Sequence, residues 1–382
     1  MVRVDGIDFY ESISGPSTVT TLRVVVAGAG ASIFGAHRRG LTGIGAEIVG
    51  VQDLNEERVR LVAAELGCRA HRTLPELLAE EADLAVILAP HPFHAELAIA
   101  ALRSGTHVLT EKPMAVEVAE ADRMVAEAEQ RGRVLAVTFQ QRTRHEVKEA
   151  RRLIGEGFLG QLQRADVLAT WPRRQTYFEV APWRGTWRGE GGGVLVNQGQ
   201  HDLDLLCHLV GRPARVAGWT RTRLQRIEAE DTAHAMLEWP SGAIGSVHLS
   251  TVEVDLGQRI ELTGTAGRLR LLPGKLELTS NGVDFRDFAA SDGDPFGAVP
   301  AGPLVEVGGG GGDHADLYRD LAEALAGNRP PIAPGREAAL ALELANAIIF
   351  SSHTGEEVSL PLDRPAYSML LESLRSTAGS RT

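Results

Sequence analysis

Cysteine is scarce in this chain, and long apolar runs are missing. Only Cys68 and Cys207 stand among 382 residues, which excludes a disulfide framework and a zinc site made of cysteines alone. So low a count fits a reducing compartment, and we expect a cytoplasmic protein. No run of about 18 apolar residues is present, which excludes a membrane-spanning helix, so no membrane partner is expected.

Basic residues are too few to form a nucleic-acid interface. The chain carries 39 Lys and Arg against 50 Asp and Glu, for a formal net charge of −11. Binding to phosphates requires a basic stripe, and none is present, so nucleic acid is not an expected partner. The densest basic cluster has helical spacing and is interpreted as a solvated helix face. It consists of Arg142, Arg144, Lys148, Arg151 and Arg152.

Length and hydrophobic pattern divide the chain into two domains after a short extension. Residues 1–20 lack the apolar segment of a signal peptide and are interpreted as that N-terminal extension. Over residues 21–144, apolar runs alternate with helical patterns, which predicts a doubly wound parallel sheet, a Rossmann domain. The expected strands are 22–27, 47–52, 84–89, 106–110 and 134–138, and the expected helices are 35–41, 56–66, one from about 73, 94–103 and 115–130.

The pattern changes after residue 144. Residues 145–382 contain long alternating runs, such as 233–239 and 243–250, which predict an α+β domain with a large, mostly antiparallel open sheet. Residues 284–312 lack periodicity and end in five glycines, so we expect a mobile loop there and consider it as a lid.

The first expected strand runs into a glycine turn. Gly28-Ala29-Gly30 fits the turn that binds the pyrophosphate of a dinucleotide. The third glycine of this fingerprint is replaced by Ile33, and Gly35 two residues later suggests an insertion. Asp53 ends the second strand, where an acid binds the ribose hydroxyls of NAD, although it could instead cap the next helix. Arg58 could meet a 2′-phosphate, so NAD is expected and NADP stays an alternative.

A lysine stands at the carboxyl end of a predicted strand. Glu111-Lys112-Pro113 follows the strand 106–110, and open α/β sheets bind their ligands outside the carboxyl ends of the strands. Lys112 should therefore lie in the dinucleotide crevice, where its ammonium group could hold a substrate oxygen. The plainer interpretation is an ion pair with a neighbouring acid.

Three stretches together resemble the Gfo/Idh/MocA family, the relatives of glucose–fructose oxidoreductase and inositol dehydrogenase. They are residues 26–30, 105–113 and 191–204. Ala89-Pro90 with His94, and Gln141-Arg142, add support. The resemblance implies a Rossmann domain followed by an α+β domain. The open sheet of that domain commonly packs against another subunit, so a homodimer or homotetramer is expected.

The resemblance also implies an activity and a site. The family mostly moves a hydride between nicotinamide and a hydroxyl carbon of a sugar or polyol, using the lysine of Glu-Lys-Pro and an Asp-x-x-x-His pair. Lys112 and His201 match these residues, whereas Asn197 replaces the usual aspartate, which removes a negative charge but keeps hydrogen bonding to substrate. The residues assigned to the cofactor are Gly28, Gly30, Ser32, Ile33, Phe34, Asp53, Ala89, Pro90, His94, Glu111 and Lys112.

The segment 194–210 carries most of the other polar candidates. If it is helical, Asn197, His201, Asp204 and His208 share one face. His201 is a candidate general base, since its unperturbed pKa is about 6.5. Asp204 could orient His201 or bind substrate. These side chains are also metal-ligand types, but the same spacing suits hydrogen bonding, and no metal is expected.

Aromatic and cationic residues gather before the glycine run 191–193. Trp171, Trp183 and Trp187 lie close to Arg184 and Arg188 in the sequence. Aromatic faces can stack on pyranose rings, although any single tryptophan could belong to the core. The residues assigned to substrate are Lys112, Trp183, Arg184, Asn197, His201 and Asp204.

The leading hypothesis is an NAD(P)-dependent dehydrogenase of a cyclic sugar, glycoside or polyol. In it, His201 is the acid/base, Lys112 holds the reacting oxygen and Asn197 positions the substrate. Two alternatives stay open. A tightly bound NAD could oxidise the substrate transiently for glycoside cleavage or epimerisation, or the protein could sense cofactor or sugar without catalysis.

Overall fold

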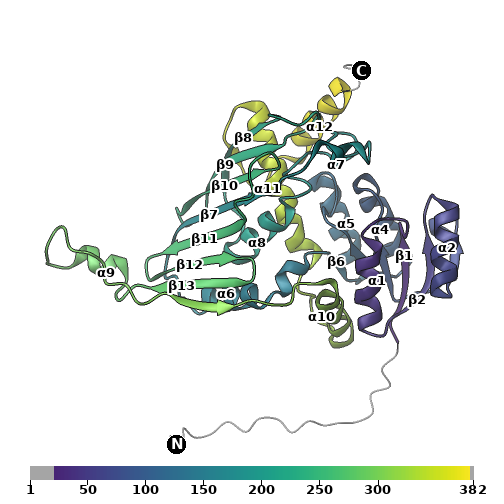
Figure 1. Ribbon diagram of the computed structural model, residues 1–382, viewed down its shortest axis with the longest axis horizontal. Coiled ribbons are helices and arrows are strands. Elements are labelled where there is room, and N and C mark those ends of the chain that lie inside the picture. Colours follow the sequence, from purple (N-terminus) through teal and green to yellow (C-terminus); the bar gives the residue numbers. More distant parts are fainter. Residues whose placement is uncertain (1–20, 379–382) are drawn as a thin grey trace, which may run out of the picture.

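The computed structural model describes residues 21–378 and shows two sheets joined by helices (Figure 1). The expected extension over residues 1–20 lies outside the described range. The first sheet uses residues 23–137 and the second uses residues 162–359. None of the described helices is long and apolar enough to cross a lipid bilayer.

The first sheet has six parallel strands. They are β1 (Arg23–Ala27), β2 (Glu47–Gln52), β3 (Arg69–His71), β4 (Leu84–Ile87), β5 (His107–Thr110) and β6 (Leu135–Val137). Their order is β3-β2-β1-β4-β5-β6, so the direction of winding reverses between β1 and β4, where a crevice for a dinucleotide forms. The expected strands are all present, and β3 is an addition. Its three residues are not fully buried, so it has no apolar run that would predict it.

Local signals place the helices of this domain. They are α1 (Phe34–Gly43), α2 (Glu56–Leu66), α3 (Leu74–Leu78), η1 (His91–Phe93), α4 (His94–Arg103), α5 (Val118–Arg131) and η2 (Gln140–Thr143). Helix α3 begins with a capping box between Thr73 and Glu76, which satisfies backbone N–H groups at its first turn. Helices α2 and α5 end at Gly67 and Gly132, both in the left-handed region, where glycine carries no steric penalty.

The second sheet has nine strands. They are β7 (Leu162–Thr170), β8 (Arg215–Arg221), β9 (Thr232–Glu238), β10 (Ile244–Ser250), β11 (Gln258–Gly264), β12 (Gly267–Leu272), β13 (Lys275–Ser280), β14 (Val305–Gly308) and β15 (Val358–Ser359). Their order is β14-β13-β12-β11-β7-β10-β9-β8-β15. Only the β7–β10 pair is parallel among these described strands, so the expected mostly antiparallel sheet is confirmed.

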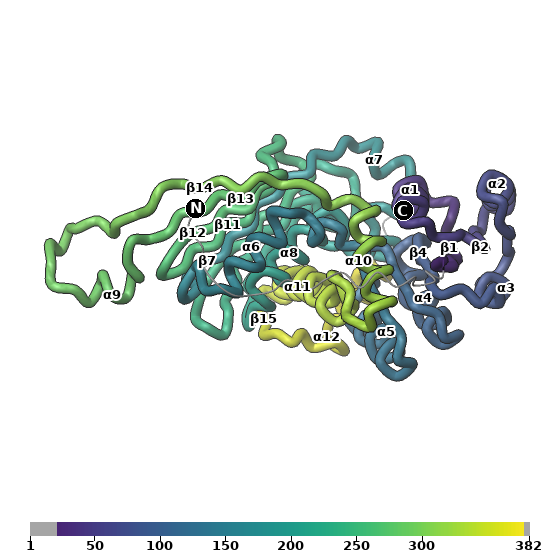
Figure 2. Tube along the Cα trace, turned by 90° about the horizontal axis from the view of Figure 1, so that it is seen from below, coloured from purple at the N-terminus to yellow at the C-terminus, as the bar shows by residue number. Residues whose placement is uncertain are grey.

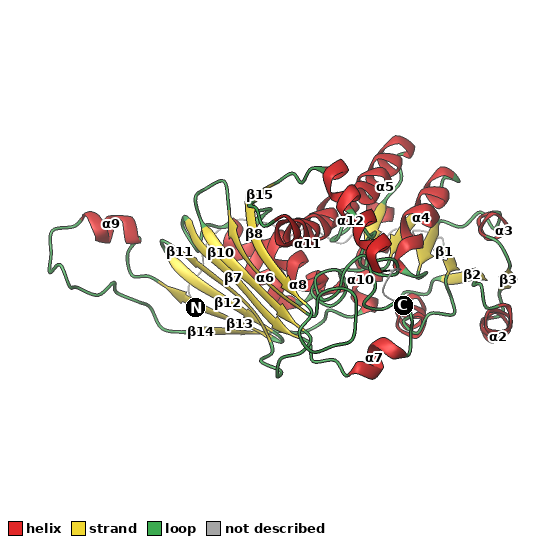
Figure 3. Cartoon of the chain, turned by 90° about the horizontal axis from the view of Figure 1, so that it is seen from above, coloured by secondary structure: helices red, strands yellow, loops and turns green. Residues whose placement is uncertain are grey.

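Helices cover one face of this sheet and leave the other open (Figure 3). The covering helices are α6 (His145–Gly155), α8 (Gln200–Val210) and α11 (Gly335–Thr354). The opposite face exposes Trp219, Met236 and Ile244 by 52%, 54% and 54%. These side chains, together with His234 and His248, define what we call the open face. The register between strands β8, β9 and β10 places these five side chains in adjacent rows across the sheet.

The segment 284–312 is more ordered than expected. It contains α9 (Phe285–Ala290) and the edge strand β14. The glycine run that follows is held by hydrogen bonds from Gly309 N to Gly274 O at 2.7 Å and from Gly310 N to Glu146 Oε2 at 3.1 Å. Helix α9 projects at the end of the molecule farthest from α1 (Figures 1 and 2), so the lid expectation is not supported.

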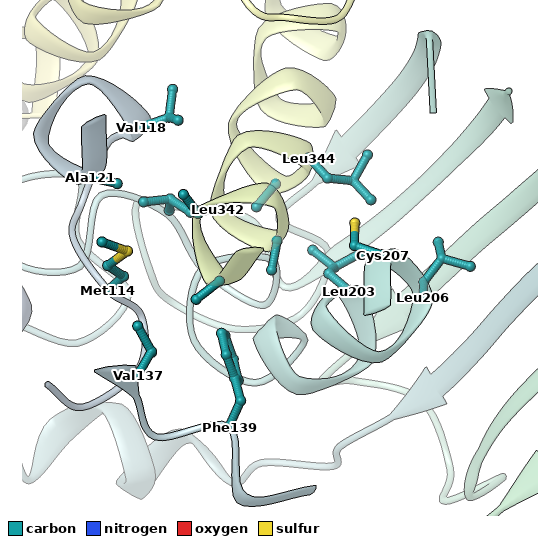
Figure 4. Packing of buried hydrophobic residues seen from close by; sticks show 14 of the residues in the cluster. Met114, Val118, Ala121, Val137, Phe139, Leu203, Leu206, Cys207, Leu342 and Leu344 are labelled. Carbon is teal, nitrogen blue, oxygen red and sulfur yellow. The ribbon is translucent and has the colours of Figure 1, made fainter. Parts of the chain in front are cut away.

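Helices from the end of the chain return to the first domain. Helix α10 (His314–Gly327) packs on α1, and α11 packs on both α5 and α8. In Figure 4, Ala121 from the first half and Leu203 from α8 lie on either side of α11, which carries Leu342. The remaining helices are α7 (Gln175–Glu179) and α12 (Arg364–Ala378). One continuous core therefore fixes the carboxyl end of β5 against α8.

Candidate active site

Two glycines of the first turn are required by close contacts. Gly28 has φ +88°, and a Cβ there would lie 2.6 Å from Ala89 N. A Cβ on Gly30 would lie 2.6 Å from the Oδ2 atom of Asp53. The backbone N–H of Gly30 donates to that same oxygen at 2.7 Å. This concave backbone beside an acidic side chain fits the pyrophosphate and ribose of a dinucleotide.

Gly35 does not replace the missing third glycine of this turn. Helix α1 begins at Phe34, directly after Ile33. A Cβ on Gly35 would find its nearest atom 3.7 Å away, so Gly35 does not take the role of the third glycine. Phe34 is buried in the core, whereas Ser32 and Ile33 are exposed beside the turn. A cofactor contact from this segment therefore comes from Ser32, Ile33 or the backbone rather than from the Phe34 ring.

Asp53 faces the glycine turn and does not cap α2. The helix cap is Asn55, whose Oδ1 accepts from the Arg58 N–H at 3.0 Å. The other Asp53 oxygen, Oδ1, accepts from Asn55 N at 2.9 Å. The alternative of Asp53 as an N-cap is thus wrong, and its carboxylate is held at the end of β2, where an acid can bind ribose hydroxyls.

His94 has a structural role. Its Nδ1 lies 2.8 Å from Pro113 O and its Nε2 lies 2.6 Å from Ala89 O. The side chain is buried and each ring nitrogen lies beside a backbone carbonyl, so His94 clamps the backbone, and its contact with a cofactor stays a prediction. This clamp ties Ala89-Pro90, which follow β4, to the residue after Lys112. The neighbouring His91 ring packs edge-on against Trp183, with centroids 5.2 Å apart.

Glu111 is fixed by a cluster of histidines. Its Oε1 lies 2.9 Å from His37 Nε2 and 4.0 Å from His314 Nε2, and its Oε2 accepts from the Lys112 N–H at 3.0 Å. Burial opposes its charge, but the His37 hydrogen bond and nearby positive charges lower the pKa of Glu111 to about 2. Tyr318 OH lies 2.8 Å from His37 Nδ1. The cluster therefore holds an ionised carboxylate beside Lys112.

The same cluster is the one set of three metal-ligand side chains that converges within residues 21–378. Histidine and carboxylate groups suit transition metals. Here, however, both Glu111 oxygens already accept hydrogen bonds. The alternative set of His201, Asp204 and His208 does not converge within this part of the chain.

Lys112 meets Asn197 across the two halves of the chain. Its Nζ donates to Asn197 O at 3.0 Å and to Asn197 Oδ1 at 3.3 Å. The Asn197 amide Nδ2 donates to Glu190 Oε1 and, at 3.3 Å, to Tyr177 OH. We call this set of four side chains the Lys112–Asn197 junction. Burial lowers the pKa of Lys112, while the charges of Glu111 and Glu190 act in the opposite direction.

The segment before α8 is not regular helix, contrary to expectation. Helix α8 begins at Gln200, and residues 194–199 form turns. Asn197 lies in these turns and His201 in the first turn of the helix. The turns are anchored by Glu230, whose Oε1 accepts from Gly193 N at 2.9 Å and from Leu195 N at 3.0 Å.

His201 carries a free ring nitrogen. Its Nδ1 is buried and has no hydrogen-bond partner among the described residues, and its ring packs edge-on against Phe139 at 5.6 Å. Burial, followed by the charge of Lys112, lowers the pKa of His201 to about 3. The imidazole is therefore neutral near pH 7.

Asp204 does not orient His201 or face the Lys112–Asn197 junction. Its two oxygens accept from Arg142 Nε at 2.9 Å and Nη2 at 2.7 Å. Arg142 Nη1 donates to Glu337 Oε2 at 2.7 Å. Burial works against the Arg142 charge, but Asp204 and Glu337 together hold the pKa of the guanidinium above its ordinary value. Arg142 is fully buried, so the solvated-face interpretation is wrong for this residue.

The tryptophans have separate environments. Trp187 is buried in the core, and its ring meets His353. Trp171 Nε1 donates to Asp202 Oδ2 at 3.2 Å. Trp183 is partly exposed, and the Arg184 guanidinium lies 5.4 Å from its ring and 4.2 Å from the Tyr177 ring. Trp183 and Arg184 are thus the pair that lies beside the Lys112–Asn197 junction.

Glu190 is a site residue that the sequence prediction missed. It is 1% exposed, and its Oε2 accepts from Gly185 N at 2.5 Å. Burial raises the pKa of Glu190 to about 7. The available signal was an acid directly before three consecutive glycines, at a turn already assigned to the site. A cavity of about 530 Å³ beside Trp187 and His353 lies elsewhere, so the site is described by its side chains.

A dinucleotide turn, with Lys112 at the carboxyl end of strand β5 in the same sheet, is typical of NAD-binding oxidoreductases. Residues 22–139 match the oxidoreductase family with an NAD-binding Rossmann fold, and residues 147–270 match the GFO/IDH/MocA C-terminal domain. The chain belongs to the Gfo/Idh/MocA family of oxidoreductases.

Similar proteins include enzymes acting on different cyclic compounds. A 1-carboxy-3-chloro-3,4-dihydroxycyclohexa-1,5-diene dehydrogenase from Comamonas testosteroni is 27% identical over 79% of this chain and 88% of its own length. Inositol 2-dehydrogenase 2 from Saccharopolyspora erythraea is 31% identical over 66% of this chain and 74% of its own. The WlbA dehydrogenase from Bordetella pertussis, in complex with NADH and UDP-GlcNAcA, is 30% identical with a TM-score of 0.75, covering 90% of this chain and 100% of that one.

Proposed function

We propose that this enzyme is an NAD-dependent dehydrogenase that oxidises a ring hydroxyl of a cyclic sugar, glycoside or polyol. The observation that carries the proposal is the contact of Lys112 Nζ, from the end of β5, with Asn197 in the turns that lead into His201. The similar proteins add support, because their names include a cyclic diol, an inositol and a nucleotide sugar. Asp53 favours NAD over NADP, since its carboxylate would repel a 2′-phosphate.

The side chains have complementary roles in this reaction. NAD, when bound, accepts the hydride with its two electrons from the carbon that carries the hydroxyl. Lys112 Nζ donates a hydrogen bond to the reacting oxygen and stabilises the negative charge that develops on it. The His201 imidazole, which is neutral near pH 7, accepts the hydroxyl proton. Asn197 positions the substrate, with Trp183 and Arg184 on its outer side.

The test is absorbance at the reduced-nicotinamide band across a panel of cyclic sugars, glycosides and polyols. We expect turnover by the wild type and a loss of about 100-fold or more in His201→Ala. His208→Ala is the matched control, since His208 lies on the same helix but near Glu337, at 3.8 Å. Equal rates in the wild type and His201→Ala would refute the role of His201. Product without net cofactor reduction would instead indicate transient oxidation, and binding without turnover would indicate a sensor.

Assembly and location are further parts of the proposal. We infer a homodimer or homotetramer in which the open face of the second sheet meets a second copy, because large apolar side chains are exposed there in adjacent rows. Light scattering of Trp219→Glu should show smaller assemblies than the wild type. An unchanged mass would exclude this face. A cytoplasmic location is supported by the two cysteines, both unpaired.

A further inference from the structure

The Asn197 side chain is held in one orientation by its neighbours. An amide has a donor end and an acceptor end, and the two are set by the hydrogen-bond network. The donor end, Nδ2, points to Glu190 Oε1 and Tyr177 OH, and the acceptor end, Oδ1, lies 3.3 Å from Lys112 Nζ. An ionised carboxylate can only accept hydrogen bonds. Ionised Glu190 therefore selects the orientation that turns Oδ1 toward Lys112.

Glu190 is built into the fold for this contact. One oxygen is anchored by the Gly185 N–H at 2.5 Å, which leaves the other directed at Asn197. The residue is 1% exposed, so bulk water does not compete for either oxygen. Of the two carboxylates whose charges act on Lys112, Glu111 is occupied by His37 and by the Lys112 backbone. Glu190 is thus the carboxylate that reaches Lys112 through the Asn197 amide.

We propose that Glu190 is a positioning residue of the dehydrogenase site, which in its ionised form orients the Asn197 amide and thereby holds the Lys112 ammonium group in place. This inference rests on the proposed function. When Glu190 gains a proton, it becomes a donor to Asn197 Oδ1, and the amide turns its NH₂ group toward Lys112. Two donors then face each other, and the buried ammonium loses both a hydrogen bond and a nearby negative charge.

The charges around Glu190 make this change relevant near neutral pH. Burial raises its pKa to about 7, opposed by the Gly185 N–H, Asn197, Arg184 and Lys112. Only ionised Glu190 turns the Asn197 Oδ1 atom toward Lys112. The rate constant kcat should therefore fall as pH decreases below about 7. The other titratable groups that interact with the junction are Glu111 and Arg173, which act on Lys112, and His91 and His201, on which Lys112 acts.

The first experiment compares Glu190→Gln with the matched control Glu228→Gln. Glu228 accepts from Trp187 N at 3.1 Å, in the same part of the fold, and has no hydrogen bond to Asn197. We expect Glu190→Gln to lower kcat about 30- to 100-fold with little change in KM, and to lose the decline of kcat below pH 7. The control should keep the wild-type rate and pH profile. An unchanged pH profile in Glu190→Gln would overturn the inference.

A double-mutant cycle separates positioning from a general structural effect. Asn197→Asp alone places a second carboxylate against Glu190 and should lower kcat about tenfold. The double variant Glu190→Gln with Asn197→Asp removes that repulsion and gives Lys112 a direct anionic partner. Its kcat should therefore recover to within about fivefold of the wild type. Additive losses would contradict the inference.

An activity-independent measurement distinguishes this inference from the proposed function. The chain has three lysines, Lys112, Lys148 and Lys275, so ¹⁵N-lysine labelling gives three side-chain NMR signals. Lys112→Arg identifies the signal of Lys112. We expect Glu190→Gln to lower the pKa of Lys112 by about one unit, since an opposite charge is lost, and to leave Lys148 and Lys275 unchanged. An unmoved Lys112 signal overturns the inference, whereas a wild type without turnover on any substrate overturns only the proposed function.

Discussion

Two buried polar contacts join the halves of this molecule, and they differ in how completely they are satisfied. Arg142 directs its guanidinium at Asp204, Glu337 and Ile332 O, and neither Arg142 nor Asp204 is accessible to water. Among the described residues, Lys112 Nζ donates only to the two oxygens of Asn197, and His201 Nδ1 has no hydrogen-bond partner. A saturated contact can only hold the structure, whereas one with spare donors and acceptors can bind a substrate.

Lys112→Ala should produce the largest effect, and should separate activity from stability. We expect turnover to fall about 1000-fold or more, ~4 kcal/mol of transition-state stabilisation, because the cation beside the reacting oxygen is lost. Binding of NADH and the melting temperature should change little. The control is Lys148→Ala, on α6, assayed for turnover, NADH binding and thermal unfolding. If Lys112→Ala lowered the melting temperature strongly and left turnover normal, the contact of Lys112 with Asn197 would be structural rather than functional.

Asp204→Ala should show the opposite pattern. Removing it leaves the Arg142 charge buried without its main partner, which costs about 3 to 5 kcal/mol of unfolding free energy. Urea unfolding measures this loss, and kcat of the folded fraction should stay within about twofold of the wild type. Glu337→Gln is the comparison variant, and since Glu337 is 53% exposed, its cost should be about 1 kcal/mol or less. Equal costs would contradict the ranking of the two partners.

The pH dependence of unfolding in Glu230→Gln tests whether Glu230 stabilises the turns before α8. Burial raises the pKa of Glu230 from 4.5 to about 7, so the native state binds a proton more strongly than the unfolded chain. Its stabilising contribution is full below about pH 4.5 and is lost as pH rises through about 7, a change of about 3 kcal/mol. Glu230→Gln should remove this share of the slope in urea unfolding between pH 4.5 and 7.5 and leave the share of Glu190, whose pKa burial also raises to about 7. Glu228→Gln should retain the full slope, and a full slope in both would refute the assignment.

Gly30→Ala should have the smallest effect of these variants. It should change only the binding of cofactor by the first domain. The new Cβ would lie 2.6 Å from Asp53 Oδ2, so the acid must move. We expect NADH binding to weaken about tenfold to a hundredfold, ~1.4 to 2.7 kcal/mol, by calorimetry. Gly35→Ala, with its nearest atom at 3.7 Å, should bind NADH as the wild type does. If Gly30→Ala and the wild type bound NADH with equal affinity, the cofactor would not lie against the glycine turn.

Local sequence patterns predicted most of the fold. Alternation of apolar runs and helices predicted the parallel sheet, and period-two runs such as 233–239 predicted the antiparallel one. The missed strand β3 and the edge strand β14 have exposed side chains, and backbone pairing with a neighbour defines them. The sequence likewise gave no warning that 284–312 is tied to Glu146, because that contact joins distant segments.

The sequence by itself predicted the glycine turn, Asp53 and Lys112 from residue types at the ends of strands, and the family resemblance pointed to His201. Only the tertiary structure decided which polar side chains meet. Asp204 and His201 lie one turn apart on α8, yet one faces Arg142 and the other the Lys112–Asn197 junction. Glu190 entered the site, and His94 became a clamp, through contacts between distant segments. Charge and hydrogen bonding depend on distances in space, and spacing along the chain does not encode those distances.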